Sequence, residues 1–418
     1  MTRNPDLAQR LAIVVSHPTQ YYSPWFRTLA ERVGLELKVF YLWDFGVTEH
    51  RDRTFGTSFA WDVPLLDGYD HEFLPNRSHD PGTHHFRGLD NPDGVEAVAS
   101  WEPDAVLVFG YNYPTHLRLI LSRKLRGIPF LFRGDSHELC PATGGKPRVS
   151  RLLRRIIFRR FERFLAVGTA NADYFRAVGI SDTKIVHVGH CVDNQRFIDS
   201  TDEAISSSKC WKQELGISEE AFVFLFAGKF EEKKRPLDLL EAFQRLGSRN
   251  SELRAQGGAV STPLPCLLFV GSGAQEGALK EAAGDEIGKQ VFFAPFQNQT
   301  EMPKVYATGN VLILPSFGRG ETWGLAVNEA MNLQRPAIVS SHVGCGPDLI
   351  SSGETGWIFP AGNLLGLEAS MRAACADAED TTRMGKLAAE RVAKYSYQAA
   401  AETVECVVHE LAESRRAR

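Results

Sequence analysis

Two glutamates flank a mostly apolar segment, GETWGLAVNEAMN, at residues 320–332. A buried carboxylate is costly unless something pairs with it, so Glu321 and Glu329 should either reach solvent or bind a ligand. If both lie on one helix, their eight-residue spacing separates them by roughly 12 Å along its axis and about 80° around it. That geometry lets both carboxylates face one ligand. The preceding residues read as a strand, VLILPS, and a glycine-rich loop, FGRGE.

The start of that helix is a candidate anion site. Thr322 can cap a helix that begins at Trp323, and the free backbone amides of a helix start attract negative charge. A nucleotide sugar, with hydroxyls at both ends and phosphates between them, fits the spacing of the two glutamates. The alternative is a surface helix in which Glu321 serves as a cap and Glu329 pairs with a lysine.

A cluster of cations follows another strand-like run, in FAGKFEEKKRP (226–236). A glycine lets the backbone approach a ligand, and lysines act as compact positive charges for phosphate. The helix expected to begin at Pro236 would add the positive field of its N-terminus. The alternative is a charged surface loop. The residues concerned are Gly228, Lys229, Lys233, Lys234 and Arg235.

The sequence gives less support for a cofactor or metal site than for the anion site described above. The glycine-rich turn FVGSGAQEG (269–277) has Glu276 where a dinucleotide fingerprint has its third glycine, so it indicates a tight turn and not NAD binding. The chain contains no Asp-x-Asp, and no histidine–carboxylate cluster stands out. We therefore expect a reaction that requires neither a cofactor nor a metal.

The composition is that of an ordinary globular protein. The 418 residues are 43% hydrophobic and 23% charged, with a net charge of -4, which suits two medium domains and gives no sign of nucleic-acid binding. The seven cysteines never form Cys-x-x-Cys, which favours a reducing compartment over disulfides or a zinc site. Because neither a signal peptide nor a run of ~18 apolar residues is found, we expect a cytoplasmic protein.

Short apolar runs alternate with helical patterns, which is typical of parallel sheets covered by helices on both faces. A polar stretch at 191–209 reads as the linker between two such halves. The prediction is an α/β protein with two doubly wound, Rossmann-like domains that face each other across a cleft, and with ligands at the carboxyl ends of the strands. The strand-like runs lie at 11–15, 35–42, 104–110 and 129–132, and then at 221–228, 266–273, 290–296, 311–316 and 335–341.

One segment, KPRVSRLLRRIIFRRFERF (146–164), is strongly basic. Its apolar residues follow helical spacing, so it predicts a helix. That helix either packs on the core with a solvated basic face, or rests on anionic lipid at the inner face of a membrane or holds an acidic acceptor. The apolar residues are Val149, Leu152, Leu153, Ile156, Ile157, Phe161 and Phe164.

The motifs between residues 221 and 363 resemble, in order and spacing, the donor domain of the family 4 glycosyltransferases, which are retaining enzymes of the GT-B fold. GKFEEKKRPLDLLEAF resembles the family's basic loop, ETWGLAVNEAMN its Glu-x7-Glu segment and VGCGPDLISSGETGWIFPAGN its closing turn. VHVGHCVDNQRF (186–197) is similar to the interdomain segment. The resemblance implies an acceptor-side domain at 1–190, a donor domain at 191–396 and a C-terminal helix, about 397–418, that packs back on the first domain.

The resemblance also implies roles for individual residues. Lys229 and Lys234, beside Gly228, would neutralise the diphosphate of the donor. Glu321 would hold hydroxyls of the transferred sugar, and Glu329 would accept hydrogen bonds from the ribose. The remaining donor contacts would be Phe296 and Gln297 at the base, and Thr322, Trp323, Gly324 and Leu325 at the distal phosphate and sugar.

The first domain departs from the family. SHPTQYYSPW (16–25) replaces the usual loop with a Gly-Gly pair, and RGDSHE (133–138) stands where many relatives have a histidine. Because these loops follow strands, they should face the cleft, although a structural role is open for each residue. The candidates are Asp135 and His137 for catalysis, and His17, Gln20 and Arg133 for contact with the acceptor or the sugar.

These features predict a retaining glycosyltransferase that moves a hexosyl-type sugar from a nucleotide diphosphate sugar, UDP-sugar before GDP-sugar, to an acceptor hydroxyl. The acceptor would be a glycan, a lipid-linked glycan or a small molecule, in glycan, polysaccharide or glycolipid synthesis. Cations and helix amides would stabilise the departing diphosphate, so neither a metal nor two catalytic carboxylates is needed. The alternatives are a GT-B nucleotide-sugar 2-epimerase and a non-catalytic module that binds sugar nucleotides.

Overall fold

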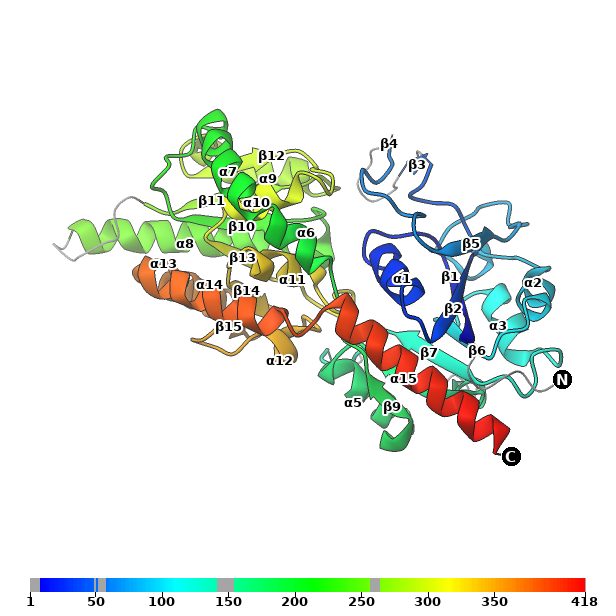
Figure 1. The fold of residues 1–418 in the computed structure, drawn as a ribbon. Helices are drawn as coiled ribbons and strands as arrows, with labels where there is room; N and C mark the ends of the chain where they lie inside the picture. The colour runs from blue at the N-terminus through cyan, green and yellow to red at the C-terminus, as the bar shows by residue number, and fades with distance from the viewer. Residues whose placement is uncertain (1–7, 49, 52–57, 141–153, 256–263, 418) are drawn as a thin grey trace.

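The computed structural model describes residues 8–48, 50–51, 58–140, 154–255 and 264–417, and it contains two α/β units that lie side by side (Figure 1). Each unit is built on one sheet whose neighbouring strands are all parallel. The prediction of two doubly wound, Rossmann-like sheets is confirmed. No helix of these ranges is both long enough and apolar enough to cross a bilayer.

The first sheet has the strand order β5-β2-β1-β6-β7-β8-β9. Its central strands are apolar throughout because alternate residues enter two different cores. In β1, Leu11 and Ile13 contact the core under α1, whereas Ala12 and Val14 contact the core under α2, α3 and α5. The strands are β1 (Gln9–Val15), β2 (Leu35–Tyr41), β5 (Asp70–Phe73), β6 (Ala105–Phe109), β7 (Phe130–Gly134), β8 (Phe161–Ala166) and β9 (Ile185–His187), and a hairpin of β3 (His50–Arg51) and β4 (Ser58–Phe59) lies apart from them. The helices are α1 (Ser23–Ala30), α2 (Gly94–Ser100), α3 (Pro114–Leu121) and α5 (Thr169–Ala177).

The second sheet has the strand order β12-β11-β10-β13-β14-β15. One face is covered by α8, α9 and α13, and the other by α6, α7, α10, α11, α12 and α14. The strands are β10 (Val223–Ala227), β11 (Cys266–Val270), β12 (Val291–Ala294), β13 (Val311–Leu314), β14 (Ala337–Ser340) and β15 (Gly356–Phe359). The helices are α6 (Asn194–Asp199), α7 (Thr201–Leu215), α8 (Pro236–Ala255), α9 (Glu276–Ala283), α10 (Met302–Thr308), α11 (Leu325–Asn332), α12 (Gly346–Leu349), α13 (Leu364–Ala376) and α14 (Ala378–Val392).

The last helix, α15 (Tyr397–Arg416), leaves the second unit and runs along the first (Figure 1). Its apolar face, which includes Val404 and Val408, belongs to the same core as Leu11 of β1. At its polar edge, Glu405 forms a salt bridge with Arg32, which follows α1. The chain therefore crosses between the two units twice, once after β9 and once before α15.

Three local predictions are wrong. The helix predicted at 146–164 ends before β8, because Phe161–Ala166 is a strand; residues 154–158 are helical, and 146–153 lie outside the described residues. The polar stretch at 191–209 is not an irregular linker, since α6 and most of α7 lie in it. The helix predicted to start at Trp323 starts at Leu325 instead.

Candidate functional site

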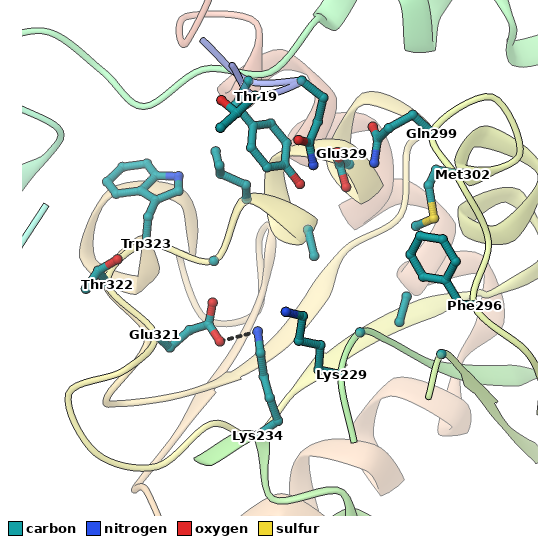
Figure 2. Close-up of a pocket in the computed structure, with 18 of the residues that line it drawn as sticks. Thr19, Lys229, Lys234, Phe296, Gln299, Met302, Glu321, Thr322, Trp323 and Glu329 are labelled. Carbon is teal, nitrogen blue, oxygen red and sulfur yellow. Dashed lines mark ion pairs between the residues drawn. The ribbon is translucent and has the colours of Figure 1, made fainter. Parts of the chain in front are cut away.

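A cavity of about 510 Å³ lies between the two units, beyond the carboxyl ends of their strands. Parallel sheets bind ligands at this edge, because the loops that follow the strands converge there. Figure 2 shows that the cavity is bordered by loops from both units. The residues of the first unit are His17, Thr19, Gln20, Tyr21, Phe45, Trp61, Asp135 and His190. Those of the second include Gly228, Lys229, Lys233, Lys234, Phe296, Gln297, Gln299, Met302, Tyr306 and residues 320–326 and 329.

Two lysines of the loop after β10 extend into the cavity. Lys234 forms an ion pair with Glu321, and Lys229 points into the same space (Figure 2). The loop turns sharply at Gly228, whose φ of 154° is open to glycine, and again at Arg235, whose φ is 54°. These turns direct both ammonium groups toward the cavity, where they create a site of positive potential for an anion.

The loop between β13 and α11 fixes the carboxylate of Glu321. The hydroxyl of Ser316 donates a hydrogen bond to Glu321 Oε2 at 3.0 Å. The backbone carbonyl of Glu321 accepts from the amide of Gly344 and from Nε2 of His137, both at 3.1 Å. With its backbone held on two sides, Glu321 presents its side chain to the cavity in one orientation.

The first turn of α11 also borders the cavity, because Gly324, Leu325 and Glu329 all line it. The chain enters this helix through Gly324, whose φ is 98°. Thr322 is not the cap that the sequence predicted; its hydroxyl donates to Asp135 of the first unit at 2.6 Å. The predicted single helix through both glutamates is therefore wrong, but the positive end of α11 still faces the space between them.

Glu329 is buried at the opposite end of the cavity from the ion pair. It is 2% exposed, and its Oε2 accepts a hydrogen bond from the hydroxyl of Tyr306 at 2.6 Å. Burial raises the pKa of Glu329, and the hydrogen bond from Tyr306, the charge of Arg196 and the nearby hydroxyl of Tyr21 counter part of that rise. Among the described residues no donor meets hydrogen-bond geometry at its Oε1. A buried acceptor without a donor is costly, so this oxygen is placed to receive one from a ligand.

The histidines of the cavity are neutral near pH 7. Nδ1 of His17 forms a hydrogen bond of 3.0 Å with the hydroxyl of Ser16, and its ring lies edge-on to Phe45. Burial lowers the pKa of His17 to about 4. His190 stacks on Tyr22, and burial together with the charge of Arg133 lowers its pKa to about 3. The positive charge in the described lining therefore comes from the lysines.

Two of the predicted first-domain residues do not line the cavity. Arg133 is buried, lies 4.7 Å above the ring of Trp25 and donates to the carbonyls of Val188 and Gly189, so it secures the crossing after β9. His137 supports the backbone of Glu321 from behind. Asp135, His17 and Gln20 do reach the cavity.

Several cavity residues were missed by sequence reasoning. Trp61 lies in the loop after β4, in a segment without a recognisable motif. Beside it, Asp62 accepts a hydrogen bond from the amide of Thr300 at 3.2 Å, and the carbonyl of Ala60 accepts from Asn298 at 2.9 Å. This contact brings Trp61 next to the predicted base edge of the second unit. The other missed residues are Thr19, Tyr21, Phe45, His190, Gln299, Met302 and Tyr306.

Comparison with known sequences finds similarity in the second unit. Residues 207–391 match the family model of the group 1 glycosyl transferases. The D-inositol 3-phosphate glycosyltransferase of Streptomyces avermitilis is 28% identical over 217 residues, which cover 52% of this chain and 44% of that protein. The sulfoquinovosyl transferase of Arabidopsis thaliana is 31% identical over 137 residues, or 32% of this chain and 26% of that protein. The matched part thus spans less than half the length of these curated relatives.

Solved structures resemble the whole chain. A glycosyltransferase from Rickettsia africae has a TM-score of 0.70 at 13% identity and covers 97% of this chain and 98% of its own. The sucrose-phosphate synthase of Thermosynechococcus elongatus has a TM-score of 0.69 at 16% identity, with 97% and 100% covered. HepE of Anabaena, solved with UDP and glucose, has a TM-score of 0.67 at 13% identity, with 96% and 99% covered. Residues 207–391 thus match the model of the group 1 glycosyl transferases, and the whole chain has the GT-B fold that these solved glycosyltransferases share.

Proposed function

We propose that the protein is a retaining glycosyltransferase that transfers a hexosyl-type sugar from a nucleotide diphosphate sugar to an acceptor hydroxyl. One observation carries this proposal: the cavity has lysines and Glu321 at one end, the buried Oε1 of Glu329 at the other, and the positive start of α11 between them. Ribose hydroxyls would donate to Glu329, the diphosphate would lie against α11 and the lysines, and Glu321 would receive hydroxyls of the sugar.

The base would lie beside Phe296 and Gln297, with Trp61 and Met302 nearby. UDP is our first choice of nucleotide. The Anabaena relative, whose fold is similar, was solved with UDP and glucose, which supports this choice. GDP-sugar is the second choice.

In the proposed reaction, the bond between the anomeric carbon and the diphosphate breaks, and negative charge grows on the leaving phosphate. Lys229, Lys234 and the amides at the start of α11 would stabilise that charge without moving, which is how preorganised sites accelerate reactions. No metal is required in this scheme, because the cations are already supplied by side chains.

The described carboxylates of the cavity support retention without a covalent intermediate. Glu321 is paired with Lys234, Glu329 is buried, and Asp135 accepts from Thr322. A double-displacement mechanism needs a carboxylate nucleophile, and we assign none of these three engaged side chains to that role. The leaving phosphate would instead take the proton of the acceptor, which attacks from the same face.

A ligand screen tests the donor assignment. UDP, GDP, ADP and their sugars would be added to the protein, and the melting temperature recorded, since a bound ligand stabilises the native state by RT ln(1 + [L]/Kd). We expect UDP or a UDP-sugar to give the largest shift. NAD is added as a further ligand, and a shift in melting temperature with NAD but with none of the sugar nucleotides would contradict the proposal. An altered sugar nucleotide formed without acceptor would identify a 2-epimerase.

We propose that the acceptor is a glycan, a lipid-linked molecule or a small molecule. We also propose that the protein contacts a membrane peripherally through the basic segment 146–164. In its described part, Arg155 and Arg159 are exposed, and Ile156 beside them is 50% exposed. We expect Arg155→Glu with Arg159→Glu to weaken binding to vesicles that contain anionic lipid. Arg163, which is paired with Glu410, is the control position. If the double variant, the Arg163 variant and the wild type all bind these vesicles equally, membrane contact at this segment is contradicted.

A further inference from the structure

A second group of functional side chains lies outside the cavity, in the loop between β5 and α2. Asp80, His84 and His85 each offer one ligand atom, and these three atoms lie within 4.8 Å of one another. This cluster did not stand out in the sequence, because its importance depends on how the loop folds back on itself. We propose that the loop binds a divalent transition-metal ion, with Zn²⁺ as the best fit.

The distances between the ligand atoms match a zinc site. Nε2 of His84 lies 3.0 Å from Oδ2 of Asp80, and Nε2 of His85 lies 3.6 Å from the same oxygen. Tetrahedral zinc binds imidazole and carboxylate at about 2.0–2.2 Å, which places neighbouring ligand atoms roughly 3.3–3.6 Å apart. The two separations from Asp80 span that range, and the ligand atoms of the two histidines lie within 4.8 Å of each other, so the rings must rotate toward a shared ion to complete the geometry. Three protein ligands leave a fourth position for water or an anion.

The loop is held closed before any ion arrives. Asn76 bridges its two ends, because its side chain accepts from the amide of Asp90 at 3.0 Å and donates to the carbonyl of Gly88 at 2.9 Å. The two halves of the loop pack closely at Gly82 and Gly88. If Gly88 carried a Cβ atom, it would lie 1.9 Å from the carbonyl oxygen of Gly82. A Cβ on Gly82 would lie 2.5 Å from Nδ1 of His84. Both histidines hydrogen-bond to Asp80, so their rings already lie near its carboxylate although they are 41% and 36% exposed.

The competing explanation is a hydrogen-bonded surface cluster. Nε2 of His84 is 3.0 Å from the carboxylate of Asp80, and Nε2 of His85 is 2.9 Å from its carbonyl oxygen. A metal would replace the protons on these nitrogens, because only neutral imidazole with a free lone pair is a ligand. Two imidazoles with one carboxylate favour zinc or copper over magnesium or calcium.

The position of the loop separates this site from the proposed transfer reaction. The loop follows the carboxyl end of β5, at the edge of the first sheet, and none of the three ligand residues lines the cavity. An ion here would cross-link the first-domain loop and leave the donor site untouched. The metal-independent transfer proposed above and this structural metal site are therefore compatible.

A zinc titration of the tag-free, full-length protein tests the proposal, with a chromophoric chelator as competitor. The wild type should bind one zinc ion more than the variant with His84→Ala and His85→Ala. Loss of an outer contact already weakens metal affinity 10–100-fold, so loss of one ligand should weaken it by about 100-fold or more. His79→Gln is the matched control, since His79 is an exposed histidine of the same loop outside the cluster. Equal stoichiometry and affinity in the wild type and the double variant would overturn the proposal.

Two further measurements guard against a variant that merely perturbs the loop. Gly82→Ala keeps all three ligands but crowds the ring of His84, so it should weaken zinc binding without abolishing it. X-ray absorption of the zinc-loaded wild type should show two imidazoles and an oxygen donor at about 2.0–2.2 Å. A shell of water oxygens without imidazole scattering would overturn the site whatever the variants do.

Discussion

Replacement of Lys234 by alanine should reduce kcat/KM for sugar transfer by about 10²–10³-fold while the fold persists. The side chain of Lys234 is 18% exposed and that of Glu321 is 11% exposed, so their charges interact in a poorly hydrated space. At an effective dielectric constant of 20, two unit charges 4 Å apart interact by about 4 kcal/mol. Loss of one preorganised group that stabilises the developing charge costs about 2.7–4 kcal/mol in other enzymes. The two magnitudes agree.

The magnitude should lie toward the upper end of this range. Without Lys234, the carboxylate of Glu321 loses its cation and would repel the diphosphate of the donor. Removal of both side chains should therefore cost less than the sum of the two single substitutions, and a double-mutant cycle measures that coupling. Lys229 stays in place in every variant and sets the residual rate.

Lys280→Ala is the matched control, because Lys280 belongs to the same unit, lies outside the cavity lining, is 49% exposed and lies 2.7 Å from Glu276. Exposed ion pairs contribute little, so this change should alter kcat/KM less than about threefold. The assay is steady-state transfer with the donor identified by the ligand screen, supported by circular dichroism and a melting curve for each variant. A well-folded Lys234→Ala protein that retains activity within about threefold of wild type would refute the proposed role in charge stabilisation.

Three other outcomes follow from the same geometry. Burial raises the pKa of Glu329 above its ordinary 4.5, so the folded state binds the proton of this carboxyl more tightly than the unfolded state does. The protonated carboxyl therefore stabilises the fold at low pH, and this stabilisation is lost as the pH rises through the folded-state pKa. Glu329→Gln should therefore have a higher melting temperature than the wild type, and the difference should grow from about pH 4.5 upward. The affinity for the donor should fall in the same variant. An equal difference in melting temperature at every pH would contradict the burial argument. Asp62→Ala removes the contact with Thr300 and should lower kcat/KM by roughly fivefold, or about 1 kcal/mol, through a less closed cavity; small-angle scattering that shows no wider spread of shapes would count against that cause. EDTA should leave transfer unchanged even where it strips the proposed surface zinc, and strict dependence on a divalent ion would exclude the metal-independent scheme.

The sheets could be predicted from sequence because their strands are buried on both faces, which leaves uninterrupted apolar runs. β5, with the sequence DHEF, was missed for the opposite reason: as an edge strand it carries charged residues that face solvent. The error at 146–164 has a more specific cause. The register between β7 and β8 skips Glu162, so Phe161 and Phe164 enter the same core although they are three residues apart. This bulge imitates helical spacing in a strand.

The donor side of the cavity could be predicted because its residues lie in loops directly after strands. Lys229, Lys234 and Glu321 lie in such loops, Glu329 lies in the helix that follows one of them, and all four line the cavity. The first-domain contributions could not be read in the same way. Trp61 reaches the cavity only because Asp62 and Ala60 bind the second unit, and nothing local in the sequence specifies such a contact.

The loop after β7 shows how a residue can serve the site without facing it. Asp135 accepts from the hydroxyl of Thr322, and His137 donates to the carbonyl of Glu321, so two successive residues of the second unit are held by the first. The position of the Glu321 carboxylate, and through the ion pair that of Lys234, therefore depends on how closely the two units approach. An open molecule would keep both side chains but lose their alignment. The approach of the two units and the orientation of Glu321 are therefore coupled through the loop after β7.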